Sequence, residues 1–486
     1  MNPGEVSLFL HPVREFIARP LVATGPRTPV RELAGQMAAA GVGSIVIVGE
    51  DGVPVGIVTD RDLRGKVVAA GRDPATTAAT DVMSTPLVTV EPGAYGFEAL
   101  LEMTRHGVHH LVVVDAGRLV GVVSSNDFLR LQTTHPVAVA REIGLAPSVD
   151  DLARLGVRIT ALVRRLVDEG GTPYDVGRIV AELNDRLIQR VLELVTGTLG
   201  AIGPPPVPFC WLAFGSEARR EQTLRTDQDN GLVYTDPSPP AAATIQAHFA
   251  RLAAAVNGAL VRVGFPECPG RIMASNPEWC QPIGVWTSRF RHWMEASGPA
   301  EVLAACIFFD LRPVGGVAEL ASSLRAVIQT DAPGSRRLLG LLARDVVDRP
   351  VPLTVFGNVR VARTGPHRDT VDLKGGGGLQ LVGAARIHAL ALGLEETNTV
   401  DRFRAAATRG VYAEAECREI TDAYQFLQRI RLVHQLGCLE RDEPADNRIN
   451  PRRLSHAEAL LLRDALRTVT HVQAGLRERY ATDLLQ

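Results

Sequence analysis

The sequence LAFGSEARREQTLRTDQDNGLVY, residues 212–234, combines a Gly-Ser turn with two carboxylates that stand one residue apart. The apolar run that ends at Phe214 predicts a strand, and the polar run from Glu217 predicts the start of a helix. Backbone N–H groups at such a turn favour the binding of a phosphate group. Asp227 and Asp229 would leave the same face of a second strand, because side chains alternate along a strand. Two carboxylates so close together predict a divalent cation, and Mg²⁺ prefers oxygen ligands.

The order of these residues resembles the nucleotidyltransferase signature of the polymerase-β-like superfamily. Gly215 and Ser216 are followed by Asp227 and Asp229, and then by the apolar pair Leu232-Val233. The wording of the stretch is similar to the nucleotidyltransferase branch related to the bacterial PII-protein uridylyltransferases. This resemblance implies that a nucleoside monophosphate is transferred from a nucleoside triphosphate to a hydroxyl acceptor. The alternative is that Gly-Ser forms a plain turn and that the Asp pair is a solvated strand end.

Three residues depart from the family pattern. Ala218 stands where relatives commonly have Gly, and Gln228 and Asn230 are polar where the superfamily usually has apolar residues that pack behind the strand. These departures keep a second hypothesis open. In it, a degenerate transferase fold binds a nucleotide or a partner as a non-catalytic sensor.

The resemblance also assigns roles within the site. Asp227 and Asp229 would be catalytic and would hold one or two Mg²⁺ ions, while Gly215 and Ser216 would fix the β- and γ-phosphates of the triphosphate. In this mechanism a metal-activated hydroxyl attacks the α-phosphorus, and pyrophosphate leaves.

Asp310 is the candidate for the third carboxylate of the metal site, which superfamily enzymes carry on a neighbouring strand. It lies in the apolar run of residues 307–312, which we predict to be a strand. A buried carboxylate needs a partner. A metal ion shared with Asp227 and Asp229 is the favoured partner, and Arg312, on the same face of that strand, is the alternative.

Basic residues would supply charge for the triphosphate. Lys374 is one of only two lysines in the chain and precedes four glycines. This segment resembles the Lys-x-Gly-Gly-Leu element of the PII uridylyltransferases, which implies that Lys374 contacts the triphosphate. Gln380 stands where those enzymes have Arg, and a glycine-rich helix entry is the alternative. The nearby arginines that either contribute charge near the phosphates or lie on the surface are Arg219, Arg220 and Arg225.

The first third of the chain contains an internal repeat. GVGSIVIV at residues 41–48 matches GVHHLVVV at residues 107–114, and GIVTDRDL at residues 56–63 matches GVVSSNDF at residues 121–128. Each copy predicts a helix, a strand, a turn, a second strand and a further helix. The repeat resembles a tandem pair of CBS domains, a module that commonly binds adenine nucleotides between its copies and stacks as dimers.

The CBS resemblance assigns a ligand role to four residues. By position, Thr59 and Ser124 would contact phosphate or ribose, and Asp62 and Asp127 would accept hydrogen bonds from the ribose hydroxyls of ATP, ADP or AMP. The alternative is that each Thr/Ser and Asp pair caps the helix that follows. We expect a homodimer through the CBS pair, with the adenine nucleotide as effector.

The expected fold class is α+β and multidomain, with a tandem CBS pair, a helical linker, a polymerase-β-like nucleotidyltransferase core and a C-terminal helical bundle. Apolar residues at helical spacing predict two long helices between the sensor and the catalyst, and these helices either couple the two or act as a spacer. The predicted boundaries are an N-terminal segment at 1–15, the CBS pair at 16–135, the linker at 136–202, the transferase domain at 203–330 and the C-terminal helical domain at 331–486.

The composition is that of a folded protein without a strong electrostatic bias. The chain has 486 residues, of which 46% are hydrophobic and 22% charged, which predicts several domains. A net charge of −2 gives no reason to expect binding to DNA or to an anionic membrane. Scattered cysteines and the lack of a long apolar window predict reduced thiols and a cytoplasmic location. The expected partners are a nucleoside triphosphate, the adenine nucleotide effector and an acceptor, which a protein could supply.

Overall fold

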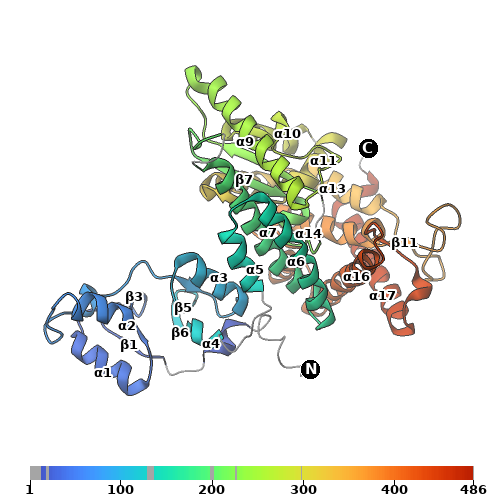
Figure 1. Ribbon diagram of the computed structural model, residues 1–486. Helices are drawn as coiled ribbons and strands as arrows, with labels where there is room; N and C mark the ends of the chain where they lie inside the picture. The colour runs from blue at the N-terminus through green and yellow to red at the C-terminus, as the bar shows by residue number, and fades with distance from the viewer. Residues whose placement is uncertain are drawn as a thin grey trace. The chain divides into compact units, whose positions relative to one another are not determined.

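The computed structural model describes residues 12–17, 21–128, 136–197, 202–224, 227–296 and 298–484 (Figure 1). The chain divides into two compact units, Met1–Glu142 and Ile143–Gln486. Both units contain helices and strands, which confirms the predicted α+β class. No helix in these described ranges has the length and apolar character needed to cross a bilayer.

Each copy in the first unit contains the predicted helix, two-stranded hairpin and further helix, and in addition a short third strand that lies outside the prediction. In each copy a short strand pairs in parallel with the middle strand, which forms an antiparallel hairpin with the last strand. The first helix of each copy ends at a glycine, Gly41 or Gly107, whose positive φ of 64° or 63° favours glycine. The elements of the first copy are β1 (Ala23–Thr24), α1 (Val30–Ala40), β2 (Ser44–Val48), β3 (Pro54–Thr59) and α2 (Asp60–Asp62), and those of the second are β4 (Thr89–Val90), α3 (Gly96–His106), β5 (His110–Asp115), β6 (Arg118–Ser124) and α4 (Ser125–Phe128).

Helix α5 (Pro136–Leu145) spans the boundary between the two units, and the second unit continues with the helices α6 (Val149–Asp168) and α7 (Pro173–Thr196). The side chains of Ser148 and Thr172 cap α6 and α7 by accepting backbone N–H bonds in the first turn. Both helices pack against α9 (Ala242–Val263), and α7 also packs against strand β10 (Leu311–Gly316). These two helices are therefore packed parts of the second unit and do not form an isolated spacer.

A four-stranded sheet lies at the centre of the second unit. Its order is β10, β7 (Phe209–Phe214), β8 (Asn230–Tyr234) and β9 (Cys280–Pro282), with antiparallel pairing except between β8 and β9. Helix α9 follows β8, and α10 (Ile283–Ala296), α11 (Pro299–Phe308) and α12 (Ala318–Asp331) complete this region.

A C-terminal group of helices packs onto the sheet region, with one apolar core running through both (Figure 1, orange to red). The predicted C-terminal helical bundle contains the helices α15 (Thr399–Thr408), α16 (Glu414–Glu440) and α17 (His456–Tyr480). They join α13 (Arg336–Asp348) and α14 (Leu379–Leu392), and a short ladder pairs β11 (Val371–Asp372) with β12 (Arg448–Ile449).

The structure corrects three local predictions. The run of residues 307–312 is not a strand, because α11 extends to Phe308 and β10 begins only at Leu311. The helix after the Gly-Ser turn is α8 (Gly215–Ala218), a single turn that ends before Arg220, where φ is 56°. Strand β8 begins at Asn230, so Asp227 and Asp229 precede the strand.

Candidate functional site

The turn after β7 brings the backbone of Gly215 against the carboxylate of Asp229. The Phe214 N–H donates to the backbone oxygen of Asp229 at 2.9 Å, which fixes the two segments side by side. Gly215 has φ 57°, and a Cβ atom at this position would lie 3.3 Å from Asp229 Oδ2. Glycine therefore permits both the conformation and the close approach of the acid.

The predicted acid pair converges in space. One carboxylate oxygen from each of Asp227 and Asp229 and the sulfur of Cys268 lie within 4.8 Å of one another. Burial raises the pKa of Asp229 to about 6, and the nearby charge of Asp227 adds to this rise, while a hydrogen bond from the Cys268 thiol opposes it. Two carboxylates that repel each other in a half-buried site form a donor set that suits a divalent cation. The sequence carries no signal for Cys268, which lies in an irregular segment after α9.

Lys374, in the C-terminal helical region, adds positive charge near the acid pair. Its ammonium charge lowers the pKa of Asp229, and the guanidinium of Arg219 acts in the same direction. Lys374 begins the glycine-rich π-helical turn η8 (Lys374–Gly378). The carboxylate of Asp372 accepts the N–H groups of Lys374 at 3.0 Å and Gly375 at 3.1 Å, which fixes the start of this turn. Ser216 follows Gly215 in α8. The predicted phosphate ligand Arg225 lies outside the described residues.

A buried network of amides supports the acid pair from behind. Asn257, on α9, donates to Gln228 Oε1 at 2.6 Å and to Asn230 Oδ1 at 3.0 Å. Gln228 also donates to the Phe265 carbonyl at 3.0 Å, and Asn230 Oδ1 accepts the Ala274 N–H at 2.9 Å. The two polar departures from the superfamily pattern are therefore buried amides that bind a partner on α9, and they do not disrupt the site.

Asp310 does not join the acid pair, which corrects the prediction of a third metal ligand. Its carboxylate is fully buried and forms ion pairs with Arg219 at 2.7 Å, Arg386 at 2.6 Å and Arg402 at 2.7 Å. Burial alone would raise its pKa, but the three guanidinium groups hold the pKa of Asp310 well below its usual range. Because both carboxylate oxygens face arginines, they are not available to a metal ion.

The alternative partner proposed for Asp310 is also wrong. Arg312 instead pairs with Asp185 on α7, and its Nη2 donates to Asp185 Oδ1 at 2.8 Å. Next to this pair lies Glu217, whose buried Oε1 has no hydrogen-bond partner in the described structure. Burial and the charge of Asp185 raise the pKa of Glu217 to about 8, so this side chain carries a proton at neutral pH.

In the first unit, the Thr/Ser and Asp pairs cap the helices that follow them. Asp62 accepts hydrogen bonds from the Thr59 hydroxyl at 2.7 Å and from Ser84 at 2.9 Å. Asp127 accepts the corresponding bond from Ser124 at 2.6 Å. Burial tends to raise the pKa of Asp62, but Lys66 and these hydroxyl donors outweigh it and lower the pKa.

The two copies differ in the space beside these caps. A cavity of about 570 Å³ adjoins Thr59 and Asp62, and its lining includes Arg61, Arg64, His109 and His110. The cavity beside Ser124 and Asp127 measures only about 50 Å³. The first of these volumes is within the range of small-molecule sites, and the second is not.

Comparison with known families finds matches in both units. Two copies of the CBS domain match residues 13–69 and 79–133. The family described as "Putative nucleotidyltransferase DUF294" matches residues 157–300, and its "Putative nucleotidyltransferase substrate binding domain" matches residues 336–480.

Several relatives match a stretch of about the length of the CBS pair. CBS domain-containing protein YhcV of Bacillus subtilis is 35% identical over 126 residues, which are 26% of this chain and 89% of that protein. An uncharacterized protein of Methanopyrus kandleri is 39% identical over 132 residues, 27% of this chain and 67% of its own length. A solved CBS domain protein of Pyrobaculum aerophilum, complexed with AMP, is 31% identical over 25% of this chain and 98% of its own, with a TM-score of 0.23. The chain therefore belongs to the CBS-domain-containing members of the family described as "Putative nucleotidyltransferase DUF294".

Proposed function

We propose that the second unit is a Mg²⁺-dependent nucleotidyltransferase, similar to the PII uridylyltransferases, that transfers a nucleoside monophosphate to a hydroxyl acceptor. The observation that carries this proposal is the convergence of Asp227 and Asp229 beside the Gly215 turn, with Lys374 close enough to act on Asp229. Family membership supports the transferase class. The specificity of a uridylyltransferase rests on the sequence resemblance alone.

In this reaction the residues of the site would have different roles. Asp227 and Asp229 would hold the cation through their carboxylate oxygens, and Lys374 would pair with the charged oxygens of the triphosphate. The turn at Gly215 and Ser216 would let the phosphates approach the backbone closely. Bound Mg²⁺ would supply the charge that lowers the pKa of the attacking hydroxyl and neutralises the leaving pyrophosphate. Asp310 has no part in this scheme, because its charge is used by three arginines.

The competing hypothesis is a sensor that binds nucleotide without chemistry. Gln228 and Ala218 are its main support, and the hydrogen bond from Asn257 accounts for the polarity of Gln228 without any loss of the acid pair. A direct assay separates the two hypotheses. With a triphosphate labelled at the α-phosphate, Mg²⁺ and a set of hydroxyl acceptors, we expect acceptor-dependent release of pyrophosphate and transfer of the label. Saturable binding of the triphosphate with no pyrophosphate released from any acceptor would support the sensor.

For the first unit, we propose that an adenine nucleotide binds in the 570 Å³ cavity beside Thr59 and Asp62 and regulates the second unit. Arg61 and Arg64 offer guanidinium groups to phosphate, which they bind through two parallel hydrogen bonds. The cavity of about 50 Å³ beside Ser124 is too small for the same ligand. The homodimer through the CBS pair stays a prediction.

Calorimetric titration with ATP, ADP and AMP tests this assignment. We expect one ligand per chain and, for Arg64→Glu, an affinity at least about tenfold weaker, because a carboxylate would replace a cation that faces phosphate. Arg118→Glu makes the same charge change on the exposed start of β6, away from the cavity, and should leave the affinity unchanged. Equal affinities of the two variants would place the nucleotide elsewhere.

A further inference from the structure

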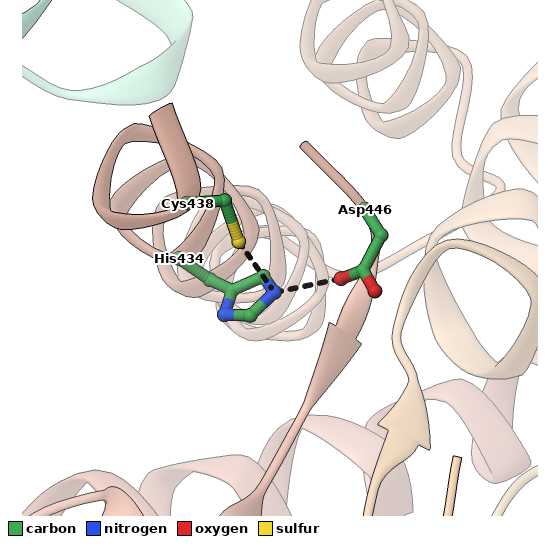
Figure 2. A group of neighbouring side chains, drawn as sticks. All are labelled: His434, Cys438 and Asp446. Atoms are coloured by element: carbon green, nitrogen blue, oxygen red, sulfur yellow. Dashed lines mark hydrogen bonds and ion pairs between the residues drawn. The ribbon is translucent and has the colours of Figure 1, made fainter. Parts of the chain in front are cut away.

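Three metal-ligating side chains meet at a place that the transferase chemistry does not use. His434 and Cys438 lie four residues apart near the end of α16, so they share one face of the helix. Asp446 reaches them from the segment that leads into β12. His434 Nε2 lies 2.7 Å from Asp446 Oδ1 and 3.5 Å from Cys438 Sγ, and Figure 2 shows the three side chains pointing toward one another.

Hydrogen bonds alone satisfy only part of this arrangement. A single nitrogen, His434 Nε2, faces both the carboxylate of Asp446 and the sulfur of Cys438. If this nitrogen carries a proton and donates it to Asp446, it has no lone pair left to accept the Cys438 S–H. A cation placed between the three groups would use a lone pair from each of them. The guanidinium of Arg441, with Nη2 at 3.6 Å from Cys438 Sγ, already brings positive charge to the sulfur.

We propose that His434, Cys438 and Asp446 form a binding site for Zn²⁺ or a similar transition-metal ion. A thiolate, an imidazole and a carboxylate form the donor set of Zn²⁺, whereas Mg²⁺ and Ca²⁺ prefer oxygen alone. Donors at tetrahedral Zn²⁺ distances lie about 3.4 Å apart. The separations of 2.7 Å and 3.5 Å are near this value, all three donor atoms lie within 4.8 Å of one another, and Asp446 is half exposed and can turn outward.

The surroundings of the site admit an ion and hold the ligands. Cys438 is 4% exposed, which keeps the sulfur in place, while the His434 side chain is 25% exposed and the Asp446 side chain 49% exposed, which leaves a path for the metal. Arg441 is half exposed and pairs with Glu443, so its guanidinium can withdraw toward that partner when a metal enters. Water would fill the fourth position of a tetrahedral ion.

The bound ion would stabilise the segment that carries Lys374. Asn447, the residue after Asp446, accepts a bond from Arg431 at 3.0 Å through its side chain and from the Leu373 N–H at 3.1 Å through its backbone oxygen. Strand β12 then pairs with β11, directly before Lys374. A metal that fixes Asp446 to α16 would therefore also fix this ladder.

Cobalt provides the test, because Co²⁺ takes zinc sites and reports a thiolate ligand by a charge-transfer absorption band. We expect the full chain, stripped with a chelator, to bind one Co²⁺ with this band, and Zn²⁺ to displace it and raise the unfolding temperature. Cys438→Ser should remove the band, and His434→Gln should weaken Zn²⁺ binding by at least about 100-fold. The readout does not depend on nucleotidyl transfer, so the outcome is separate from the function proposed above.

Two control variants make the assignment sharp. Cys417→Ser removes another buried thiol of α16 and should leave the band unchanged. Cys268→Ser removes the thiol beside Asp227 and Asp229 and should also leave it unchanged. The proposal is wrong if the stripped protein gives no thiolate band, or if the band survives in Cys438→Ser and disappears in Cys268→Ser. Folding of each variant is checked by its thermal unfolding without metal, which should remain a single cooperative transition even where the loss of a buried thiol lowers the unfolding temperature.

Discussion

Asp229→Asn is expected to lower the rate of nucleotidyl transfer by about 10³-fold or more and, at the same time, to make the metal-free protein more stable. The loss follows because a cation contributes several kcal/mol of charge stabilisation in the transition state, and each 1.4 kcal/mol is about tenfold in rate. The gain in stability follows because burial raises the pKa of Asp229 to about 6. At neutral pH the ionised carboxylate is therefore less favourable in the folded protein than in the unfolded chain. An amide of the same shape removes that buried charge.

Two measurements check this result together. Initial rates of pyrophosphate release are compared with and without Mg²⁺, and thermal unfolding is followed by tryptophan fluorescence in the presence of a chelator. All four tryptophans lie in the second unit, so the fluorescence reports the unit that contains the site. Glu267→Gln is the matched control, because it makes the same change at an exposed acid next to Cys268 and should alter neither quantity. A variant Asp229→Asn that keeps full Mg²⁺-dependent transfer would remove Asp229 from the catalytic site.

The parts of this protein that could be predicted from sequence are those with local patterns. The CBS repeat has two copies with matching segments at 41–48 and 107–114 and at 56–63 and 121–128, and the long helices have apolar faces at 3.6-residue spacing. The acid pair could also be predicted, because Asp227 and Asp229 are neighbours in the chain and follow a Gly-Ser turn at a fixed distance. In each case the residues that determine the structure lie close together in the sequence.

The surroundings of Asp310 could not be predicted in this way. Its partners Arg386 and Arg402 come from α14 and α15, far along the chain, and no spacing links them to Asp310. The apolar run at 307–312 was too short to separate a strand from the end of a helix, and it proved to contain the end of α11. The amide network could not be predicted for a related reason. Buried Gln228 and Asn230 side chains are unfavourable unless they are hydrogen-bonded, and their partner Asn257 comes from α9.

Asp310→Asn is expected to destabilise the second unit by about 3–5 kcal/mol, because it removes the carboxylate from a buried cluster and leaves arginines uncompensated. The three ion pairs connect the segment before β10 to the residue that follows α8 and to α14 and α15, so this one carboxylate joins the sheet region to the C-terminal helices. The Gly215 N–H also donates to the Asp310 carbonyl at 3.2 Å, which places the cluster next to the Gly215 turn.

The dependence of this cost on pH follows from the depressed pKa of Asp310. In the unfolded chain an aspartate has a pKa of about 3.9, whereas in the folded protein the pKa of Asp310 lies well below this. Its contribution to stability is therefore complete above about pH 4 and is lost only as the pH falls toward the folded-state value. The difference between the parent protein and Asp310→Asn should be constant from about pH 5 to pH 8.

Denaturant unfolding followed by tryptophan fluorescence measures the cost in the second unit alone. Asp345→Asn is the matched control, because Asp345 forms an ion pair with Arg349 in which both side chains are more than one third exposed, and its loss should cost no more than about 1 kcal/mol. If Asp310→Asn unfolds like the parent protein but no longer binds Mg²⁺, then Asp310 is a metal ligand after all. A large loss of stability in Asp310→Asn, with a similar loss in Arg402→Leu, would instead show that the cluster stabilises the packing of the C-terminal helices on the sheet.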